Sequence, residues 1–114
     1  MSVSAKGIIS AAFAPNAIGT IYTSPTNPNI TTIIDKFTVS NPTGAGATIT
    51  IYIVPFGGTA GNSNLIVYQF SVGSHNTSDL TVMQNQVLNP GDTIKVVASV
   101  ANSIVVRGSG RQVV

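Results

Sequence analysis

Apolar and polar residues alternate along much of this chain with a period of two, the pattern of a β-strand with one buried face. The clearest stretch is residues 47–53, where alanine and isoleucine occupy every second position, with threonine or tyrosine between them. Threonine, valine and isoleucine dominate the alternating stretches, and these β-branched side chains suit a pleated sheet. No stretch keeps the period of about 3.6 residues that a helix requires, so we expect no helix of note.

Eight stretches are predicted to be strands: residues 6–13, 20–23, 33–40, 47–53, 65–72, 79–83, 93–100 and 103–108, with residues 110–114 as an extension of the last. Turn-forming residues separate them at intervals of about 8 to 12 positions, which is typical of a sandwich or barrel. The strongest turn signal is Asn89-Pro90-Gly91-Asp92, where Pro and Gly stand as a type II turn requires. We therefore predict an all-β, antiparallel two-sheet sandwich of about eight strands, jelly-roll-like, in an unspecified strand order.

The chain has 114 residues, which corresponds to one domain, so we predict a single β-sandwich over residues 1–114. Residues 1–7 and 109–114 lack helix signals and carry few charges. We expect these two segments to be extended arms that make contacts between subunits.

In two of the expected strands, the alternation makes specific predictions about which side chains share a face. In the third, Asp35 falls in line with Phe37 and Val39 on the apolar face, which is unusual for a carboxylate. We interpret Asp35 as a strand entry, a bulge or the partner of Lys36 or Arg107. In the fifth, the alternation places Ile66, Tyr68, Phe70 and Val72 together on one face.

Charge is scarce: only 7% of the residues are charged, there is no glutamate, and the net charge is +2. The pI of 9.3 therefore reflects a small imbalance, and five scattered cations do not form a stripe that could follow a nucleic-acid backbone. A monomer usually stays soluble through a well-charged surface, so this composition favours a subunit that hides surface in an assembly. The alternative is a monomer that threonine and asparagine keep soluble.

The composition also bears on compartment and membranes. The chain has no cysteine, which excludes disulfides, thiolate metal sites and a cysteine nucleophile. Its longest apolar runs fall well short of the roughly 20 residues that a membrane helix needs, so we expect no membrane partner. Residues 6–14 faintly resemble a signal peptide, with one lysine before a very short apolar run. We interpret them as the first strand, and secretion stays a minor alternative.

The residues that could carry catalysis are few. One compact group contains Ser74, His75 and Asp79, but neighbouring side chains in a turn usually diverge, so we interpret His75 as a surface residue. Asp92 has a simpler role as a turn residue that bonds its own backbone. The glycine-rich residues 44–46 and 57–61 lack the lysine and the helix of a phosphate loop. We predict no enzyme activity, no catalytic residue, no cofactor and no metal; weak calcium binding in the Asn-rich loops stays open.

Apolar side chains also fall on the presumed outer faces of the sheets, where a free sandwich would meet water. They are Ile34, Tyr52, Val54, Val97 and Val105. A contiguous apolar patch on a surface usually marks an interface. We predict an interface at these residues, with coverage by loops or by the N-terminal arm as the alternative.

Several stretches, taken in order, resemble the small β-sandwich virion proteins of tailed bacteriophages. They are GTIYTSP at residues 19–25, IIDKFTVSN at 33–41, ATITIY at 47–52, LNPGDTI at 88–94 and IVV at 104–106. The resemblance covers the chain from about Lys6 onward and is strengthened by the near-absence of charge. It carries no catalytic residue with it, because such proteins are typically non-enzymatic.

The resemblance implies a virion protein, assembled in the host cytoplasm, that binds the major capsid protein or tail proteins. A capsid decoration (cement) protein that stabilises the phage head through subunit contacts is the first expectation, and a tail or fibre accessory protein is the second. Such proteins are commonly homo-oligomers, and we expect one here, with a trimer as one form. The contrasting hypothesis is a module that recognises carbohydrate or a receptor, against which the sequence offers no Trp and only three Tyr.

Overall fold

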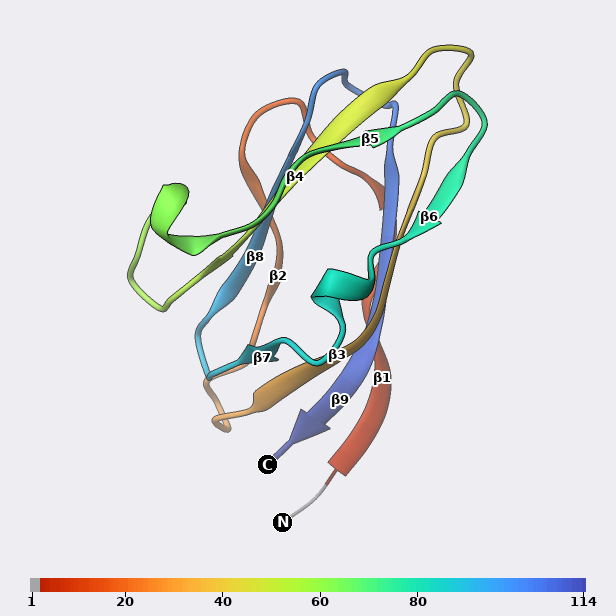
Figure 1. Cartoon of the computed structure of the whole chain (residues 1–114). Coiled ribbons are helices and arrows are strands. Elements are labelled where there is room, and N and C mark those ends of the chain that lie inside the picture. Colours follow the sequence, from red (N-terminus) through yellow and green to blue (C-terminus); the bar gives the residue numbers. More distant parts are fainter. Residues whose placement is uncertain (1–2) are drawn as a thin grey trace.

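The strands of the computed structural model, which describes residues 3–114, form two antiparallel sheets that pack face to face (Figure 1). The strands are β1 (Val3–Phe13), β2 (Gly19–Thr23), β3 (Thr31–Ser40), β4 (Ala47–Val54), β5 (Leu65–Val72), β6 (Thr77–Asp79), β7 (Val87–Leu88), β8 (Thr93–Ala98) and β9 (Val105–Val113). Two single turns of 3₁₀-helix, η1 (Asn62–Asn64) and η2 (Thr81–Met83), interrupt the loops. The all-β prediction is therefore confirmed.

The strand pairing is nested. β1 pairs with β9, β2 with β8, β3 with the short strands β6 and β7, and β4 with β5, all of them antiparallel. One sheet, here sheet A, has the order β1-β9-β3-β6 with β7 also on β3; sheet B has the order β2-β8-β4-β5. This is one long hairpin wound into two sheets, which is the jelly-roll arrangement. The predicted sandwich and its jelly-roll character are confirmed.

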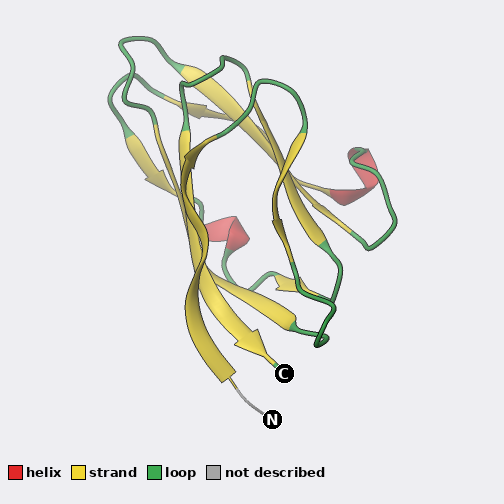
Figure 2. Cartoon of the chain, turned by 180° about the vertical axis from the view of Figure 1, so that it is seen from behind, coloured by secondary structure: helices red, strands yellow, loops and turns green. Residues whose placement is uncertain are grey.

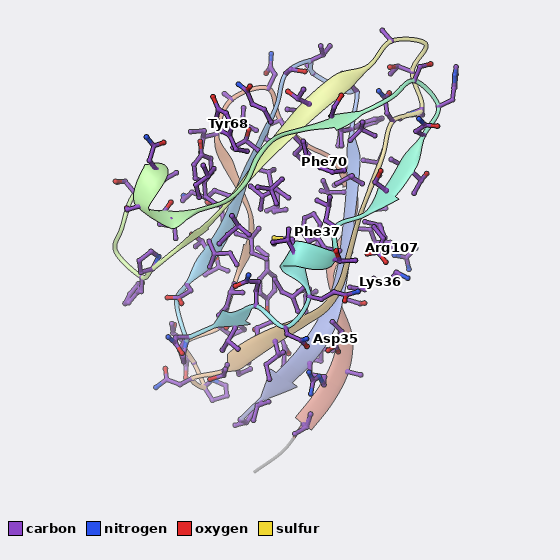
Figure 3. The ribbon with its side chains drawn as sticks, in the orientation of Figure 1. Asp35, Lys36, Phe37, Tyr68, Phe70 and Arg107 are labelled. Carbon is purple, nitrogen blue, oxygen red and sulfur yellow. The ribbon has the colours of Figure 1, made fainter. Side chains whose placement is uncertain are left out.

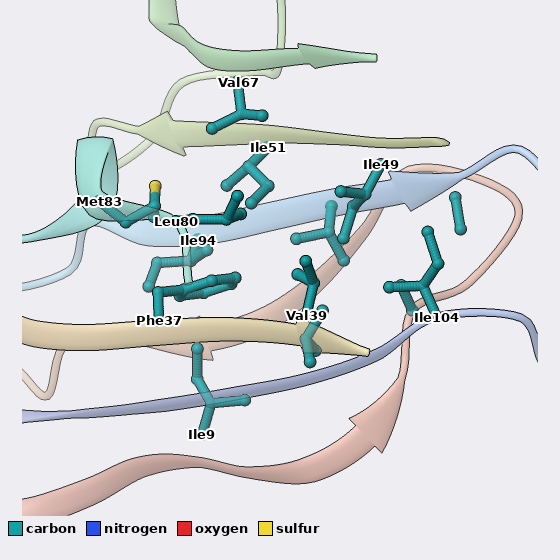
Figure 4. Packing of buried hydrophobic residues seen from close by; sticks show 14 of the residues in the cluster. Ile9, Phe37, Val39, Ile49, Ile51, Val67, Leu80, Met83, Ile94 and Ile104 are labelled. Atoms are coloured by element: carbon teal, nitrogen blue, oxygen red, sulfur yellow. The ribbon is translucent and has the colours of Figure 1, made fainter. Parts of the chain in front are cut away.

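The core lies between the sheets and is built mostly from isoleucine, valine and one phenylalanine (Figure 4). In β8 the alternation is complete, because Ile94, Val96 and Ala98 are buried and the residues between them are half-buried. Phe37 of β3 is the largest fully buried side chain. Leu80, which precedes η2, and Met83, the last residue of η2, are buried in the same cluster.

A bulge in β3 reverses the predicted phase of its first half. The pairing of β3 with β9 shifts between Ile34 and Lys36, so one residue is inserted there. As a result Ile34 joins Phe37 and Val39 in the core, and Asp35 is exposed. The interpretation of Asp35 as a bulge residue is confirmed, but its partner is Arg111, at 2.9 Å, and not Lys36 or Arg107.

A second bulge, in β5, also corrects a predicted face. Ile49 of β4 pairs with Phe70 and Ile51 with Val67, so Tyr68 and Gln69 together lie opposite Thr50. Gln69 has φ of 46°, and its backbone N–H donates to the Thr50 hydroxyl at 3.0 Å. Consequently Tyr68 is exposed, and the expected face of Ile66, Tyr68, Phe70 and Val72 does not exist.

Two other strands begin or end at different residues than predicted. The sixth predicted strand, residues 79–83, ends at Asp79, because the chain turns into η2 and buries Met83. The last strand begins two residues later than predicted and continues through residues 110–113 to Val113. The Asn89–Asp92 turn is confirmed, with Gly91 at φ of 88° and Asp92 N–H donating to the Asn89 carbonyl at 3.0 Å.

The two predicted arms lie side by side at one end of the molecule (Figure 2). Val3, Ser4, Ala5 and Lys6 pair in regular register with Val113, Gln112, Arg111 and Gly110. Residues 1–2 of the predicted N-terminal arm lie outside the described part of the chain. Within that part, the arm segments are paired with each other.

Candidate assembly surface

The charged side chains are concentrated on the outer face of sheet A (Figure 3). Asp35, Lys36, Asp79, Arg107 and Arg111 all lie there. Arg111 pairs with Asp35 at 2.9 Å, and Lys36 pairs more loosely with Asp79 at 3.6 Å. Because these groups are well exposed, the pairs contribute little to stability, about 0–1 kcal/mol each. A hollow of about 230 Å³ on this face is lined by Lys36, Thr38, Arg107, Gly108 and Ser109.

The outer face of sheet B has a different composition. Tyr52 lies opposite Lys95, and Val97 lies opposite Thr50, so Tyr52 and Val97 are diagonal neighbours on β4 and β8. Lys95, the one charged residue in the described strands of this sheet, donates to the Thr20 hydroxyl at 2.8 Å. A shallow hollow of about 140 Å³ beside Val97 is lined by residues without charge: Thr48, Thr50, Gln69, Val97, Ala98 and Ser99.

Tyr68 extends this face at the edge of sheet B. Its side chain is 68% exposed, and the β5 bulge turns it outward beside Thr50 (Figure 3). Sheet B therefore presents two tyrosines, a valine and several hydroxyls with little charge, which is the composition of a contact surface. We name Tyr52, Tyr68 and Val97 the sheet B patch.

The five predicted interface residues do not form one surface. Tyr52 and Val97 are half-buried neighbours on the outer face of sheet B, whereas Val105 is half-buried on β9 in sheet A. Ile34 is wrong as an outer residue, because the β3 bulge turns it into the core, where it is fully buried.

Val54 is also buried, for another reason. It is 1% exposed but lies outside the main core cluster, and its side chain lies 3.4 Å from the position that a Cβ on Gly58 would take. The loop after β4 is held over it by Phe56, whose N–H donates to the Asp92 carboxylate at 3.1 Å. Coverage by a loop, the alternative considered for these residues, is what the structure shows for Val54.

The Ser74 and His75 side chains lie closer together than expected. The Ser74 hydroxyl is 3.0 Å from His75 Nδ1, so the expectation that they diverge is wrong. Both are exposed, Ser74 also donates to the Thr43 carbonyl at 3.0 Å, and Asp79 lies with Lys36 on sheet A. The pair therefore lacks the third group that would orient a catalytic base.

Asp92 has the structural role that its turn predicted. One carboxylate oxygen accepts from Asn89 N–H at 3.0 Å and the other accepts from Phe56 N–H. Residues 3–114 contain no group of three or more His, Asp or Glu side chains placed to share a metal ion. None of the helical turns in the same residues is long or apolar enough to cross a membrane.

Two features, one in each sheet, were missed from the sequence. Strict alternation grouped Tyr68 with Ile66, Phe70 and Val72, and the inserted residue at Gln69 separates exposed Tyr68 from buried Val72. Sequence alternation also gave no sign that β1 is an outer strand of its sheet with an unpaired edge.

Known proteins share this fold at low sequence identity. No protein-family model and no curated protein matches the sequence. A structure described as "Bacillus endospore appendages form a novel family of disulfide-linked pili" matches with a TM-score of 0.56 and 16% identity, over 97% of this chain and 87% of that one. A chain of the infectious bursal disease virus Gx strain matches with a TM-score of 0.55 and 13% identity, over 97% of this chain.

A mutant VP2 protein of the same virus, in T=1 particles, matches with a TM-score of 0.54 and 12% identity. This chain spans only 31% of either viral chain, and at these identities the likeness shows the fold alone. The expected relation to tailed bacteriophages is not shown by these matches.

Proposed function

We propose that this chain is a non-enzymatic structural protein of a virion, and more specifically a decoration protein that binds and stabilises the head of a tailed bacteriophage. The observation that carries the proposal is the sheet B patch, an outer sheet face that exposes tyrosine and valine and has one charged residue among its strands. Such a face is suited to burial against another protein surface.

The fold likeness supports a structural role without specifying the assembly. The two kinds of protein with a similar fold are a viral capsid protein and a pilus protein, and the descriptions of both place them in large protein assemblies. This chain contains no cysteine, so a disulfide-linked assembly like that of the pilus is not open to it. Its contacts with partners must then come from surface burial and backbone pairing.

The partners that fit this proposal are the major capsid protein, through the sheet B patch, and further copies of this chain. We place the protein in the virion after assembly in the host cytoplasm, and we propose a homo-oligomer, of which a trimer is one form. Val105 and the segments 3–7 and 109–114, on sheet A, are available for contacts between copies.

The first test is the copy number of the protein in purified virions, measured by quantitative mass spectrometry against the major capsid protein. Near-stoichiometric amounts would support the decoration role. A handful of copies would place the protein at the tail or portal vertex, which is the tail-accessory alternative. Complete absence from virions would refute the proposal.

A second test separates the two sheet faces. Val97→Asp introduces a charge into the sheet B patch, and we expect binding to heads that lack the protein to weaken by about tenfold or more. Thr77→Asp, at an exposed position of β6 in sheet A, is the matched control and should bind as the unchanged protein does. Equal binding by both variants would show that the sheet B patch is not the contact surface.

A second candidate function, recognition of a neutral carbohydrate, is favoured by one observation. Tyr68 is exposed beside Gln69 and the hydroxyl-lined hollow at Thr48 and Thr50, and aromatic faces next to amides and hydroxyls suit sugar rings. Binding of neutral oligosaccharides on a glycan array, abolished by Tyr68→Ala, would support it. No binding on the array would remove this candidate and leave the decoration role untouched.

A further inference from the structure

The first four described residues of β1 are held only through their pairing with β9. Val3, Ser4, Ala5 and Lys6 are all exposed, and Val3 is 56% exposed. Their side chains make no hydrogen bond or ion pair with residues 3–114. This segment, here the donor segment, therefore buries almost no apolar surface, and its attachment depends on a short backbone ladder.

The rest of β1 is attached more firmly. A bulge between Lys6 and Ile9 separates the donor segment from Ile9, which is 4% exposed and packs against Gly108 in the core cluster that also contains Phe37. Gly7 lies within this bulge, and a Cβ added to it would meet nothing within 4 Å. The bulge and its unrestrained glycine allow the donor segment to change direction while Ile9 stays in place.

The part of β9 that pairs with the donor segment, Gly110–Val113, is also held by contacts with β3 and β2. Gly110 lies so close to β3 that an added Cβ would collide with the Ile33 carbonyl oxygen. Arg111 pairs with Asp35 at 2.9 Å, and the Gln112 amide donates to the Tyr22 hydroxyl at 3.0 Å. None of these contacts involves β1, so the acceptor strip, Gly110–Val113, keeps its shape whether or not its own donor segment occupies it.

We propose that the donor segment of one copy pairs with the acceptor strip of a second copy of this chain. The fit to a second copy follows from the structure itself, because the same residues in the same register already form the pairing within one chain. Exchange of an identical element conserves the contacts and is therefore an inexpensive route to an oligomer. Reciprocal exchange gives a dimer, and exchange in one direction closes a ring of copies.

Because the chain has no cysteine, single cysteines can report this pairing directly. Val3 and Val113 lie opposite each other in the register and make no side-chain hydrogen bond. A tagged Val3→Cys chain and an untagged Val113→Cys chain are refolded together at high protein concentration and oxidised. We expect a disulfide between tagged and untagged chains, seen as a mixed dimer on a non-reducing denaturing gel.

The matched control uses Ser40→Cys and Thr77→Cys, whose native hydroxyls are 3.0 Å apart between β3 and β6. This pairing lies within the sandwich, so a mixture of the two single variants should give only background cross-linking. When both cysteines are in one chain, they should instead form an intrachain disulfide. We expect the Val3→Cys and Val113→Cys mixture to give at least about tenfold more mixed dimer than the control, because paired strands hold the thiols at high effective concentration.

Two results would overturn the proposal. Mixed dimer at the level of the control would show that the donor segment stays on its own chain. Cross-linking of Val3→Cys only with itself would show that the free edges of two β1 strands pair without exchange. The biological purpose of the exchange rests on the proposed assembly role, but this test uses purified protein alone, so its failure is distinct from absence of the protein from virions.

Discussion

Strands β8 and β1 are both antiparallel, yet they contribute to the fold in opposite ways. β8 lies inside sheet B between β2 and β4 and buries Ile94, Val96 and Ala98. β1 is nearly twice as long, with 11 residues against 6, but it lies at the edge of sheet A and buries only Ile9. One strand is held by side-chain burial and the other mainly by its backbone ladder.

This difference shows where the molecule can give up contacts without losing its fold. Burial of apolar area is the dominant favourable term in folding, so the strands of sheet B and the centre of sheet A carry the stability. An exposed edge strand adds little burial and presents unpaired backbone groups to other chains. The comparison therefore assigns most of the stability to β3, β4, β8 and β9, and it agrees with the proposal that β1 pairs with a second copy.

The largest effect is expected from a charge in the central strands. Ile51→Asp places an unpaired carboxylate in the core between the two sheets, where Ile51 is fully buried, and should abolish folding. Far-UV circular dichroism and urea unfolding would detect this. Tyr52→Asp, one residue further and opposite Lys95, is the control and should fold. A cooperatively melting Ile51→Asp protein would show that the register of β4 is wrong.

The one buried residue of β1 should give the next effect. Ile9→Ala removes a side chain that packs on Gly108 in the core cluster, and should lower the free energy of unfolding by about 2–3 kcal/mol. The exposed loop residue Ile18 is the control, and Ile18→Ala should change it by less than about 0.5 kcal/mol. If urea titrations showed that the two substitutions lower the free energy of unfolding equally, Ile9 would contribute no more to core packing than an exposed residue.

A substitution where two backbones lie close together should lower the free energy of unfolding by a comparable or smaller amount. Gly110→Ala directs a methyl group at the Ile33 carbonyl, which cannot rotate away, and should cost about 1–3 kcal/mol of unfolding free energy. Gly7→Ala meets no atom within 4 Å and should be nearly neutral. If Gly110→Ala and Gly7→Ala had the same melting temperature, the close contact between β9 and β3 would be contradicted.

The smallest effect is expected in the donor segment. Ala5→Asp adds a charge to an exposed position of β1 opposite Arg111 and should alter the unfolding free energy by less than about 0.5 kcal/mol. A loss of several times that amount in chemical unfolding would show that Val3–Lys6 contributes to stability, and would remove the contrast with β8.

Much of the strand content was predictable, for a clear physical reason. Where a strand is regular, alternation of side chains reports directly which face is buried, as in Ile49 and Ile51 of β4. The Pro-Gly turn before β8 was equally predictable, because few residues other than glycine accept its positive φ. The fifth predicted strand agrees with β5 in both of its boundaries.

The candidate surface was predictable only in part. Tyr52 and Val97 lie on the outer face where alternation placed them, since the pairing of β4 with β8 is uninterrupted. Ile34 was placed on the wrong face, and Tyr68 was wrongly grouped with Val72, because an inserted residue reverses every side chain beyond it. Val54 was placed outside correctly but is covered by a loop, a contact between segments that periodicity does not report.

The class of this protein follows from its amino-acid composition and pattern: it is an all-β chain with almost no charge and no cysteine, in which catalytic groups are few. Composition and a period of two report these properties because they depend on each residue and its near neighbours. The folded structure, in contrast, is needed to see which strands are central, where the bulges fall and that residues 3–6 pair with residues 110–113. These depend on contacts between segments far apart in the chain, and the backbone pairing that makes them carries no side-chain signature.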